Sequence, residues 1–599
     1  MEYTQNTVPC GKVCTEHVGS KITLRGWVNR RRDHGTIIFI DLRDRSGLMQ
    51  LVISPDLSKD VHTKAQEIRS EYVIVVEGTV VKRSDATINK NLPTGEFELQ
   101  VSDLQILSRA KTLPFQLEEA KNVDEELRLR YRYIDLRRPE MLEIFALRHR
   151  IIFAIREFLN KEDFYEVETP ILTKNTAEGA REFLVPSRNI PGSFYALPQS
   201  PQVYKQLLMA GGFEKYFQIA RCFRDESNRA DRQPEFTQMD LEMSFTDEKT
   251  IQTLIESLLS HVYKTIFGKT LQLPMRRMRY DDAMRLYGCD KPDLRFDLPI
   301  QDITKTFESS PITFIQAALK KGGKVGALHI QNKNFSRSEL ESWTNKAKIA
   351  GAQGLIWMRI GENDVIESSI VKHLPTDIVT QLRAIIPTLA VGDTLFVIAG
   401  DYKQSWTALG RLRLQLGKAL DLIANRDEFL WVTDFPLLEW NEEGKRWVSA
   451  HHPFTRPQEG WENKKPEDIK ARSYDIVLNG VELGSGSIRI HEKELQYQIF
   501  NFLGLDADDM KGHFGFLLEA QELGFPPHGG IALGLDRFLM LMLGLEDIRD
   551  IIAFPKTGSG SDLLMGAPTP VSDKKLKDYA LVLKQAPCVK GQSESHSEK

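Results

Sequence analysis

Residues 217–245 read FQIARCFRDESNRADRQPEFTQMDLEMSF. Polar and apolar residues alternate at both ends, which predicts two strands joined by a long polar loop. Residues two apart in a strand share a face, so Gln238, Asp240 and Glu242 point the same way. A solvated outer face is the ordinary explanation of such a row. The facing apolar residues need burial, however, and arginines crowd the loop, so one site could hold both a triphosphate and an amino acid.

Two pieces of this stretch resemble a known family. FRDE at 223–226, followed by a loop and a carboxylate-bearing strand, resembles motif 2 of the class II aminoacyl-tRNA synthetases. The closing PEFTQMDLE at 234–242 is similar to the bacterial aspartyl form of that motif. The remaining segments of the chain can support or contradict this resemblance.

Length, charge and cysteine content limit the class of protein. A chain of 599 residues is too long for one core and predicts three or four domains. The formal net charge of -4 means that an RNA partner must bind to local patches. Five cysteines without CxxC pairs favour free thiols in a reducing compartment and no structural zinc. There is no apolar signal segment and no long apolar run, so we expect a cytoplasmic protein without a membrane span.

Residues 1–110 read as five short strands with one amphipathic helical segment, which predicts a Greek-key barrel of the OB type. Basic residues near Arg30 precede a strand that carries Phe39, an arrangement suited to a single-stranded RNA loop. Spacing alone equally allows Phe39 in the core and the arginines in a solvated turn. The synthetase resemblance implies an anticodon-binding domain, with these tRNA-binding residues: Arg30, Arg32, His34, Phe39 and Gln50.

His34 follows the RRRD sequence, at a position where aspartyl enzymes that charge only tRNA-Asp tend to have leucine. Enzymes that also charge tRNA-Asn tend to have histidine there. The resemblance therefore implies possible charging of tRNA-Asn, and with it a functional link to a tRNA-dependent amidotransferase.

A charged linker at 111–140 precedes a long amphipathic helix expected over 141–160. The arginines of the linker could contact RNA or form a solvated helix face. The helix and the following FYEVETPIL resemble motif 1, whose proline here is Pro170, and this implies a homodimer. We assign 141–285 to the first part of the catalytic domain.

The polar segment 173–188 has loop composition and resembles a loop that closes over aspartate, with Glu178 at the amino group. LPQSPQVYKQLLM, at 197–209, places Ser200, Gln202 and Lys205 near the start of a helix. A lysine at such a position is usually exposed, but in the aspartyl pattern it faces the substrate carboxylate.

The sequence pattern changes over residues 286–412, where segments typical of helices and strands alternate with glycine-rich turns. This pattern predicts a separate inserted α/β domain. Bacterial aspartyl enzymes carry such an insertion, of the kind shared with amidotransferase subunits. Its role cannot be read from the sequence.

The catalytic domain is expected to resume at 413–565. AHHPFT supplies His451, which the resemblance places near the aspartate side chain; a hydrogen-bonded turn histidine is the alternative. Asp475 and Glu482 stand near the ends of two adjoining strands, with Arg489 beyond them. Carboxylates beside phosphates suit Mg²⁺.

GGIALGLDRFLMLMLG, at 529–544, brings glycines close to a ligand before an apolar helix that carries Arg537. A buried arginine needs an anion, and the segment resembles motif 3, whose arginine binds the γ-phosphate of ATP. Residues 566–599 are expected to form a C-terminal extension with a disordered polar tail.

Together, these features predict an α+β fold, an antiparallel sheet flanked by helices, with an N-terminal OB-type barrel and an inserted α/β domain. The resemblance implies an ATP-dependent aspartate–tRNA ligase acting on L-aspartate and tRNA-Asp, with Mg²⁺ held by Asp475 and Glu482. An asparaginyl or lysyl enzyme, or a relative that binds RNA without catalysis, are the alternatives.

Catalysis is expected to rest on Arg224, Glu226 and Arg537. The ATP-binding residues are expected to be Arg224, Asp225, Glu226, Gln233, Phe236, Glu482, Gly534, Leu535, Asp536 and Arg537. The aspartate-binding residues are expected to be Glu178, Ser200, Gln202, Lys205, Arg224, Gln238, Asp240, His451 and Arg489.

Overall fold

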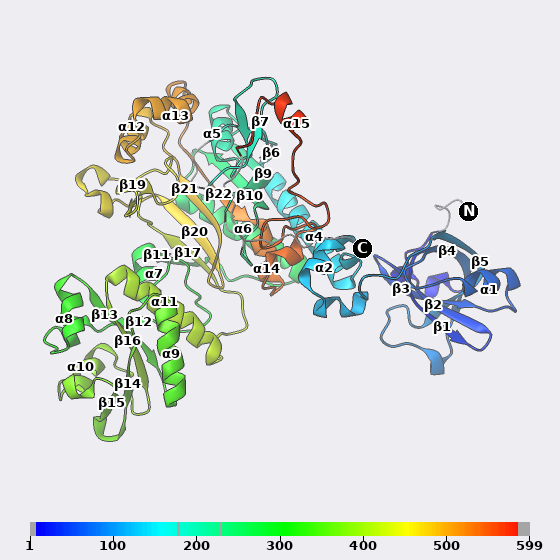
Figure 1. Ribbon diagram of the computed structural model, residues 1–599, viewed down its shortest axis with the longest axis horizontal. Helices are drawn as coiled ribbons and strands as arrows, with labels where there is room; N and C mark the ends of the chain where they lie inside the picture. The colour runs from blue at the N-terminus through cyan, green and yellow to red at the C-terminus, as the bar shows by residue number, and fades with distance from the viewer. Residues whose placement is uncertain (1–6, 176–179, 227–228, 585–599) are drawn as a thin grey trace. The chain divides into compact units, whose positions relative to one another are not determined.

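The computed structural model describes residues 7–175, 180–226 and 229–584 (Figure 1). Its chain forms two compact units. The first comprises Met1–His149 and Arg549–Thr569, and the second comprises Arg150–Ile548 and Pro570–Lys599.

The first unit contains a closed five-stranded barrel, drawn in blue in Figure 1. The strands are β1 (Lys21–His34), β2 (Ile37–Asp44), β3 (Gly47–Ile53), β4 (Val73–Lys82) and β5 (Phe97–Ser108), and the helix between β3 and β4 is α1 (Lys59–Gln66). The order around the barrel is β1-β2-β3-β5-β4. Along β2, buried Ile38 and Ile40 alternate with the half-exposed Phe39. The predicted OB-type barrel is confirmed, and Phe39 lies on its outer surface, which contradicts the alternative that placed it in the core.

The linker after the barrel forms short helices, α2 (Glu125–Arg130) and α3 (Arg132–Asp135). Its arginines do not all form a solvated or RNA-facing row. Arg132 and Arg138 are buried and both pair with the buried Asp135, at 2.6 and 2.7 Å. Arg132 also donates to the backbone carbonyls of Arg549, Ile552 and Ala553. The expectation for these two arginines was wrong, because charge spacing cannot reveal a buried carboxylate.

The second unit is built on an eight-stranded sheet of order β11-β17-β20-β21-β22-β10-β9-β6. The strands are β6 (Tyr165–Glu166), β9 (Lys215–Phe223), β10 (Glu235–Ser244), β11 (Arg276–Arg279), β17 (Phe429–Thr433), β20 (Ser473–Leu478), β21 (Val481–Ile488) and β22 (His528–Gly534). The six strands from β17 to β9 are antiparallel to one another, and the outer strands β11 and β6 pair in parallel with β17 and β9. The predicted pair of strands around the polar loop is confirmed as β9 and β10.

Helices and two small hairpins accompany this sheet (Figure 1). The helices are α4 (Pro139–Lys161), α5 (Gln202–Ala210), α6 (Glu248–Phe267), α7 (Tyr280–Tyr287), α12 (Lys493–Phe502), α13 (Ala507–Glu522), α14 (Leu535–Met542) and α15 (Asp573–Asp578). The hairpins are β7 (Leu184–Pro186) with β8 (Phe194–Ala196), and β18 (Leu438–Asn441) with β19 (Arg446–Ser449). Both α5 and α14 contact β10, so this strand collects side chains from two helices. Within the described ranges, no helix is both long and apolar enough to cross a membrane.

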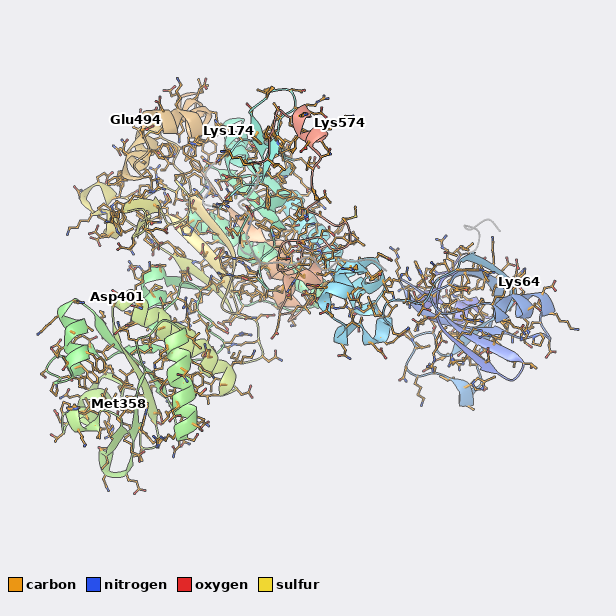
Figure 2. All side chains as sticks on the ribbon, in the orientation of Figure 1. Lys64, Lys174, Met358, Asp401, Glu494 and Lys574 are labelled. Atoms are coloured by element: carbon orange, nitrogen blue, oxygen red, sulfur yellow. The ribbon has the colours of Figure 1, made fainter. Side chains whose placement is uncertain are left out.

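The inserted segment has its own five-stranded antiparallel sheet, of order β12-β13-β16-β14-β15. Its elements are β12 (Ile300–Asp302), α8 (Thr313–Lys320), β13 (Lys324–Ile330), α9 (Arg337–Ile349), β14 (Ile356–Ile360), β15 (Ile366–Ser368), α10 (Ile378–Ile385), β16 (Thr394–Gly400) and α11 (Tyr402–Ala419). Figure 2 labels Met358 in β14 and Asp401, whose carboxylate caps α11 by accepting from the Gln404 amide. Leu412 and Leu416 of α11 belong to the insertion's core. The expected boundary at residue 412 therefore falls inside α11, because this helix packs as one piece.

Candidate active site

A cavity of about 780 Å³ lies beside β10 in the second unit. Its walls come from α5, the β9–β10 loop, β10, the β20–β21 pair and the start of α14. It brings together these residues predicted from the sequence: Ser200, Gln202, Lys205, Arg224, Glu226, Gln233, Phe236, Gln238, Asp240, His451, Asp475, Glu482, Arg489, Gly534, Asp536 and Arg537. Of the described residues in the prediction, Asp225 and Leu535 do not line the cavity, and Glu178 lies outside the described residues.

Buried charges occupy one end of the cavity. The Lys205 ammonium lies 3.2 Å from Asp240 Oδ1 and 3.3 Å from Glu242 Oε2. Arg489 approaches the other side of Glu242, with Nε 2.9 Å from Oε1 and Nη2 3.2 Å from Oε2. All four side chains are nearly inaccessible to solvent. Glu242 thus joins two cations, and its two contacts fix where they stand.

The two carboxylates of this cluster differ in pKa direction. Burial raises the pKa of Asp240, and the single nearby ammonium of Lys205 does not offset the rise. Burial acts on Glu242 as well, but the charges of Arg489 and then Lys205 outweigh it and leave its pKa lowered. Asp240 Oδ2 is buried without a hydrogen-bonding partner among the described residues, and so is Gln202 Nε2. This end of the cavity therefore offers one acceptor and one donor to a polar ligand.

Arg489 has two further neighbours. Its Nη1 donates to Ser487 Oγ at 2.6 Å and faces His452 Nε2 at 2.5 Å. Burial and then the Arg489 charge lower the pKa of His452 well below its usual value, so the imidazole is neutral. The other ring nitrogen of His452, Nδ1, accepts from the Phe454 backbone amide at 3.2 Å and lies 3.4 Å from Thr455 Oγ1.

Aromatic and cationic groups also line the cavity. The Arg224 guanidinium lies over the Phe236 ring, 5.1 Å from its centroid. The exposed Glu226 pairs with Arg232 across the β9–β10 loop at 3.1 Å. A ring beside a guanidinium provides a flat apolar surface with adjacent positive charge.

Motif residues of β22 and α14 line the cavity as well. Gly534 pairs with Gln238 and precedes α14 as its N-cap residue. Arg537 Nη1 donates to the backbone carbonyl of Glu482 at 2.8 Å, and its Nη2 lies 3.4 Å from Asp231. The buried Asp536 accepts from the Thr237 amide at 2.7 Å, which ties α14 to β10. Arg537 is therefore held at the cavity wall by backbone as well as by charge.

Asp475 and Glu482 stand on the β20–β21 hairpin, where Asp475 pairs with Ser485 and Val477 with Glu482. Burial, followed by the Glu482 charge, raises the pKa of Asp475 well above its usual value. Asp475 Oδ1 is buried and has no hydrogen-bonding partner among the described residues. Two neighbouring carboxylates with an unsatisfied oxygen make a donor set suited to a hard divalent cation.

His451 also lines the cavity. Its Nδ1 lies 3.3 Å from Ser485 Oγ, and its ring meets Phe435 edge-on at 4.9 Å between centroids. Burial lowers the pKa of His451, although the Glu482 carboxylate opposes the change. A neutral imidazole can take part in hydrogen bonding without adding charge.

No site role was expected for Glu242, Ser487 or His452, although Glu242 contacts Lys205 and the other two contact Arg489. Glu242 belonged to the alternating row at 238–242, and this spacing was the available signal. Nothing local in the sequence connects Ser487 or His452 to Arg489, because their contacts arise from the packing of strands.

The residues predicted to bind tRNA lie on β1, β2 and β3 of the barrel. Arg32 lies 2.7 Å from Asp41 and 3.4 Å from Gln50 Oε1. The exposed His34 contacts the Phe39 ring edge-on at 5.9 Å. Arg30 is exposed, whereas Gln50 is buried and donates to Glu98. The outer surface therefore presents two rings beside basic groups.

Comparison with known families agrees with both parts of the chain. Residues 124–558 match the model described as tRNA synthetases class II (D, K and N), and residues 22–107 match the OB-fold nucleic acid binding domain. The chain belongs to this class II family and is an aminoacyl-tRNA synthetase.

Individual relatives are similar over almost the whole chain. An Aspartate--tRNA(Asp/Asn) ligase of Geobacillus sp. (strain WCH70) is 49% identical over 585 residues, which are 96% of this chain and 98% of the relative. An Aspartate--tRNA ligase of Oceanobacillus iheyensis is 49% identical over 579 residues, 96% of this chain and 98% of the relative. Among solved structures, asparaginyl-tRNA synthetase from Pyrococcus horikoshii complexed with asparaginyl-adenylate has a TM-score of 0.58 at 20% identity, covering 92% of this chain and 98% of that one. This last likeness concerns the fold.

Proposed function

We propose that the protein is an aspartate–tRNA ligase, which forms aspartyl-AMP from L-aspartate and ATP and transfers the aspartyl group to tRNA-Asp. The observation that carries the proposal is the set of charged side chains that one cavity brings together. The buried Lys205 and Arg489 line it, and so do Arg224, Arg537 and the acidic pair of Asp475 and Glu482. Relatives that are about half identical bear names with the same activity.

The buried end suits aspartate. Arg489 and Lys205 would bind the side-chain carboxylate, because both are cations already oriented by Glu242. The substrate ammonium would contact Asp240, whose Oδ2 is an unsatisfied acceptor, and Gln202 contributes to the same region. Ser200, Gln238 and His451 complete this wall. The role suggested for Glu178 by resemblance belongs to the proposal as well.

The groups around Arg224 and Arg537 suit ATP. Adenine would stack on Phe236, and Glu226 would accept from its amino group. Arg224 would contact the α-phosphate and Arg537 the γ-phosphate, while Gln233, Gly534 and Asp536 shape the remaining wall. The substrate α-carboxylate attacks the α-phosphorus in line and pyrophosphate leaves, so no protein nucleophile is required. These side chains act by positioning and by stabilising charge.

Mg²⁺ fits the acidic pair of Asp475 and Glu482. The buried, unpartnered Asp475 Oδ1 supplies one oxygen ligand, and the neighbouring Glu482 supplies a second. The described residues form no group of three or more metal-binding side chains, so the remaining ligands would be phosphate oxygens. When bound, the ion would neutralise charge on the phosphates.

The alternatives receive less support. An asparagine side chain offers no charge for Arg489 and Lys205, and a lysine side chain would be repelled by them. A relative without catalysis has no need to keep Arg224, Glu482 and Arg537 around one cavity.

The proposal extends to the RNA partner. Residues 1–110 would bind the anticodon through the barrel surface around Arg32, His34 and Phe39. His34 favours charging of tRNA-Asn as well, followed by conversion of the product by an amidotransferase. Residues 141–285 and the strands from β17 onward would carry the chemistry in the cytoplasm, where tRNA is charged.

We also propose a homodimer formed through the motif 1 region. Tyr165, Ile171 and Leu172 are exposed apolar residues around Pro170, and Phe153 of α4 is 63% exposed. The Arg156–Glu166 pair joins α4 to β6 beside them. Several exposed apolar side chains in one region commonly mark an interface. A solution mass equal to that of one chain at micromolar concentration would contradict this assignment.

The first experiment is ATP–pyrophosphate exchange with purified protein. Exchange should require both aspartate and Mg²⁺ and should not occur with asparagine or lysine in place of aspartate. Subsequent charging should yield aspartyl-tRNA-Asp. Exchange that depends on asparagine or lysine would overturn the assignment, and so would folded protein without exchange.

A further inference from the structure

One cation in the cavity belongs to no synthetase motif. Lys291 lies in the loop between α7 and β12, where the chain leaves the catalytic sheet for the insertion. Both Asp290 and Lys291 line the cavity. The insertion's base therefore contributes charged groups to the active site.

Packing fixes the position of this loop on its two sides. On one side, a Cβ at Gly480 in the β20–β21 turn would lie only 2.8 Å from the Asp293 Cβ, so the turn and the loop are in close contact. On the other side, the buried Arg413 of α11 donates to the backbone carbonyls of Asp293, Phe296 and Leu298 at 2.9 to 3.0 Å. The loop that carries Lys291 is thus fastened both to the acidic hairpin and to a helix of the insertion.

The Lys291 ammonium reaches the same hairpin that carries the acidic pair. Its Nζ lies 4.0 Å from Glu482 Oε2, and the side chain is 46% exposed. Arg537 donates to the backbone carbonyl of Glu482, so Glu482 contacts two cations. An ion pair at this distance and exposure is weak, and it leaves the lysine available to a more highly charged anion.

We propose that Lys291 binds the β- and γ-phosphates of ATP, and the pyrophosphate product, together with Arg537. This inference rests on the proposed function, and it gives the insertion's base loop a part in substrate binding. A lysine acts as a point charge on phosphate and needs no fixed geometry, which suits a flexible side chain on a rigid loop.

The competing explanation is that Lys291 only balances the charges of Asp290, Asp475 and Glu482. The two explanations predict opposite effects. If Lys291 binds phosphate, its loss weakens the binding of ATP and pyrophosphate. If it only balances carboxylates, its loss leaves the binding of magnesium-bound ATP unchanged or strengthens it, because the acidic pair attracts the cation more strongly.

The test compares Lys291→Met with Lys291→Arg and with the control Lys324→Met. Lys324 is 43% exposed and pairs with Asp302 at 3.0 Å, so it matches Lys291 in exposure but does not line the cavity. Equilibrium binding of ATP and of inorganic pyrophosphate, with MgCl₂, is measured by calorimetry, and the KM values for ATP and aspartate by exchange.

Lys291→Met should weaken the binding of ATP and pyrophosphate by about 10- to 100-fold and leave the KM for aspartate within a few-fold. Lys291→Arg should retain most of the affinity, and Lys324→Met should match the unmodified chain. Unchanged or tighter nucleotide binding in Lys291→Met overturns the inference, and so does an equal rise in both KM values. Failure of the unmodified chain to catalyse exchange would instead refute the proposed function.

Discussion

Arg489 is the residue on which amino-acid selection should depend most directly. Its guanidinium is 2% exposed and contacts Glu242, Ser487 and His452. Arg489→Leu removes one of the two cations proposed for the substrate carboxylate and leaves Glu242 with Lys205 alone. Truncating one partner of a buried charge pair typically costs about 2–5 kcal/mol. We therefore expect the KM for aspartate to rise by about two orders of magnitude, and the KM for ATP by no more than a few-fold.

The control for this change is Arg472→Leu. Arg472 pairs with Glu248 through two contacts but does not line the cavity, so its loss tests a damaged ion pair without a damaged site. Melting temperatures of both variants show whether the chain still folds. Equal losses for aspartate and ATP in Arg489→Leu would contradict the assignment of Arg489 to the aspartate side chain.

Residue identities carried different amounts of information about the site. An anionic ligand for Arg537 could be predicted from the sequence, because a lone cation in an apolar helix needs an anion. For Glu242, only the alternating spacing of the row at 238–242 could be seen in the sequence. Its partners Lys205 and Arg489 lie 37 and 247 positions away along the chain. Such contacts depend on how β10, α5 and β21 pack, and local sequence does not encode that.

At the scale of elements, the pairing of β10 with β22 determines how closely two backbones approach beside Glu242, which contacts Lys205 and Arg489. Gly530 pairs with Glu242, and a Cβ at Gly530 would lie 2.0 Å from Glu242 Oε2 and 2.2 Å from the Leu241 carbonyl oxygen. Gly530→Ala must therefore displace Glu242 or separate the strands. Loss of a buried charge contact costs about 3–5 kcal/mol. We expect a lower melting temperature and, in the protein that remains folded, a raised KM for aspartate.

Gly512→Ala is the matched control for this strand substitution. Gly512 lies in α13, and an added Cβ would meet nothing within 4 Å. Alanine is favoured over glycine inside a helix by about 1 kcal/mol, so this variant should be as stable as the unmodified chain or more so. If Gly530→Ala melts and binds aspartate like Gly512→Ala, the close approach of β10 and β22 has no part in positioning Glu242.

Element types followed from the sequence where periodicity was strong. Alternation gave β9 and β10 and the barrel strands, and amphipathic spacing gave the α4 helix. The residues at which helices begin and end were less predictable. Helix α11 continues through residue 412 because Leu409, Leu412 and Leu416 pack in one core. The buried Asp135, which holds Arg132 and Arg138, has no local signal, since an acidic residue in a charged segment normally reads as solvated.

At the scale of the whole molecule, the sequence predicted the fold class because three motifs occurred in family order along the chain. It could not predict which residues outside those motifs reach the cavity. Lys291 and Asp290 do so because the insertion begins at a loop packed on the β20–β21 turn. This placement depends on two folded sheets meeting, which is a property of tertiary packing and not of any segment.

The choice of tRNA is the property that requires the whole molecule, because the barrel and the catalytic cavity belong to separate units. His34 ends β1 with its ring against the edge of Phe39, where both are available to stack on an RNA base. Stacking of one base on an aromatic side chain contributes about 1–3 kcal/mol. We expect the unmodified enzyme to aspartylate both tRNA-Asp and tRNA-Asn, and His34→Leu to lower kcat/KM for tRNA-Asn by about tenfold or more while tRNA-Asp changes little.

Aspartate-dependent exchange of pyrophosphate without tRNA should be the same in both proteins, and His62→Leu, in α1 of the same barrel, should leave both tRNA reactions unchanged. Equal loss with both tRNAs would make His34 a general RNA contact without selectivity, and charging of tRNA-Asp alone by the unmodified enzyme would refute the role given to His34.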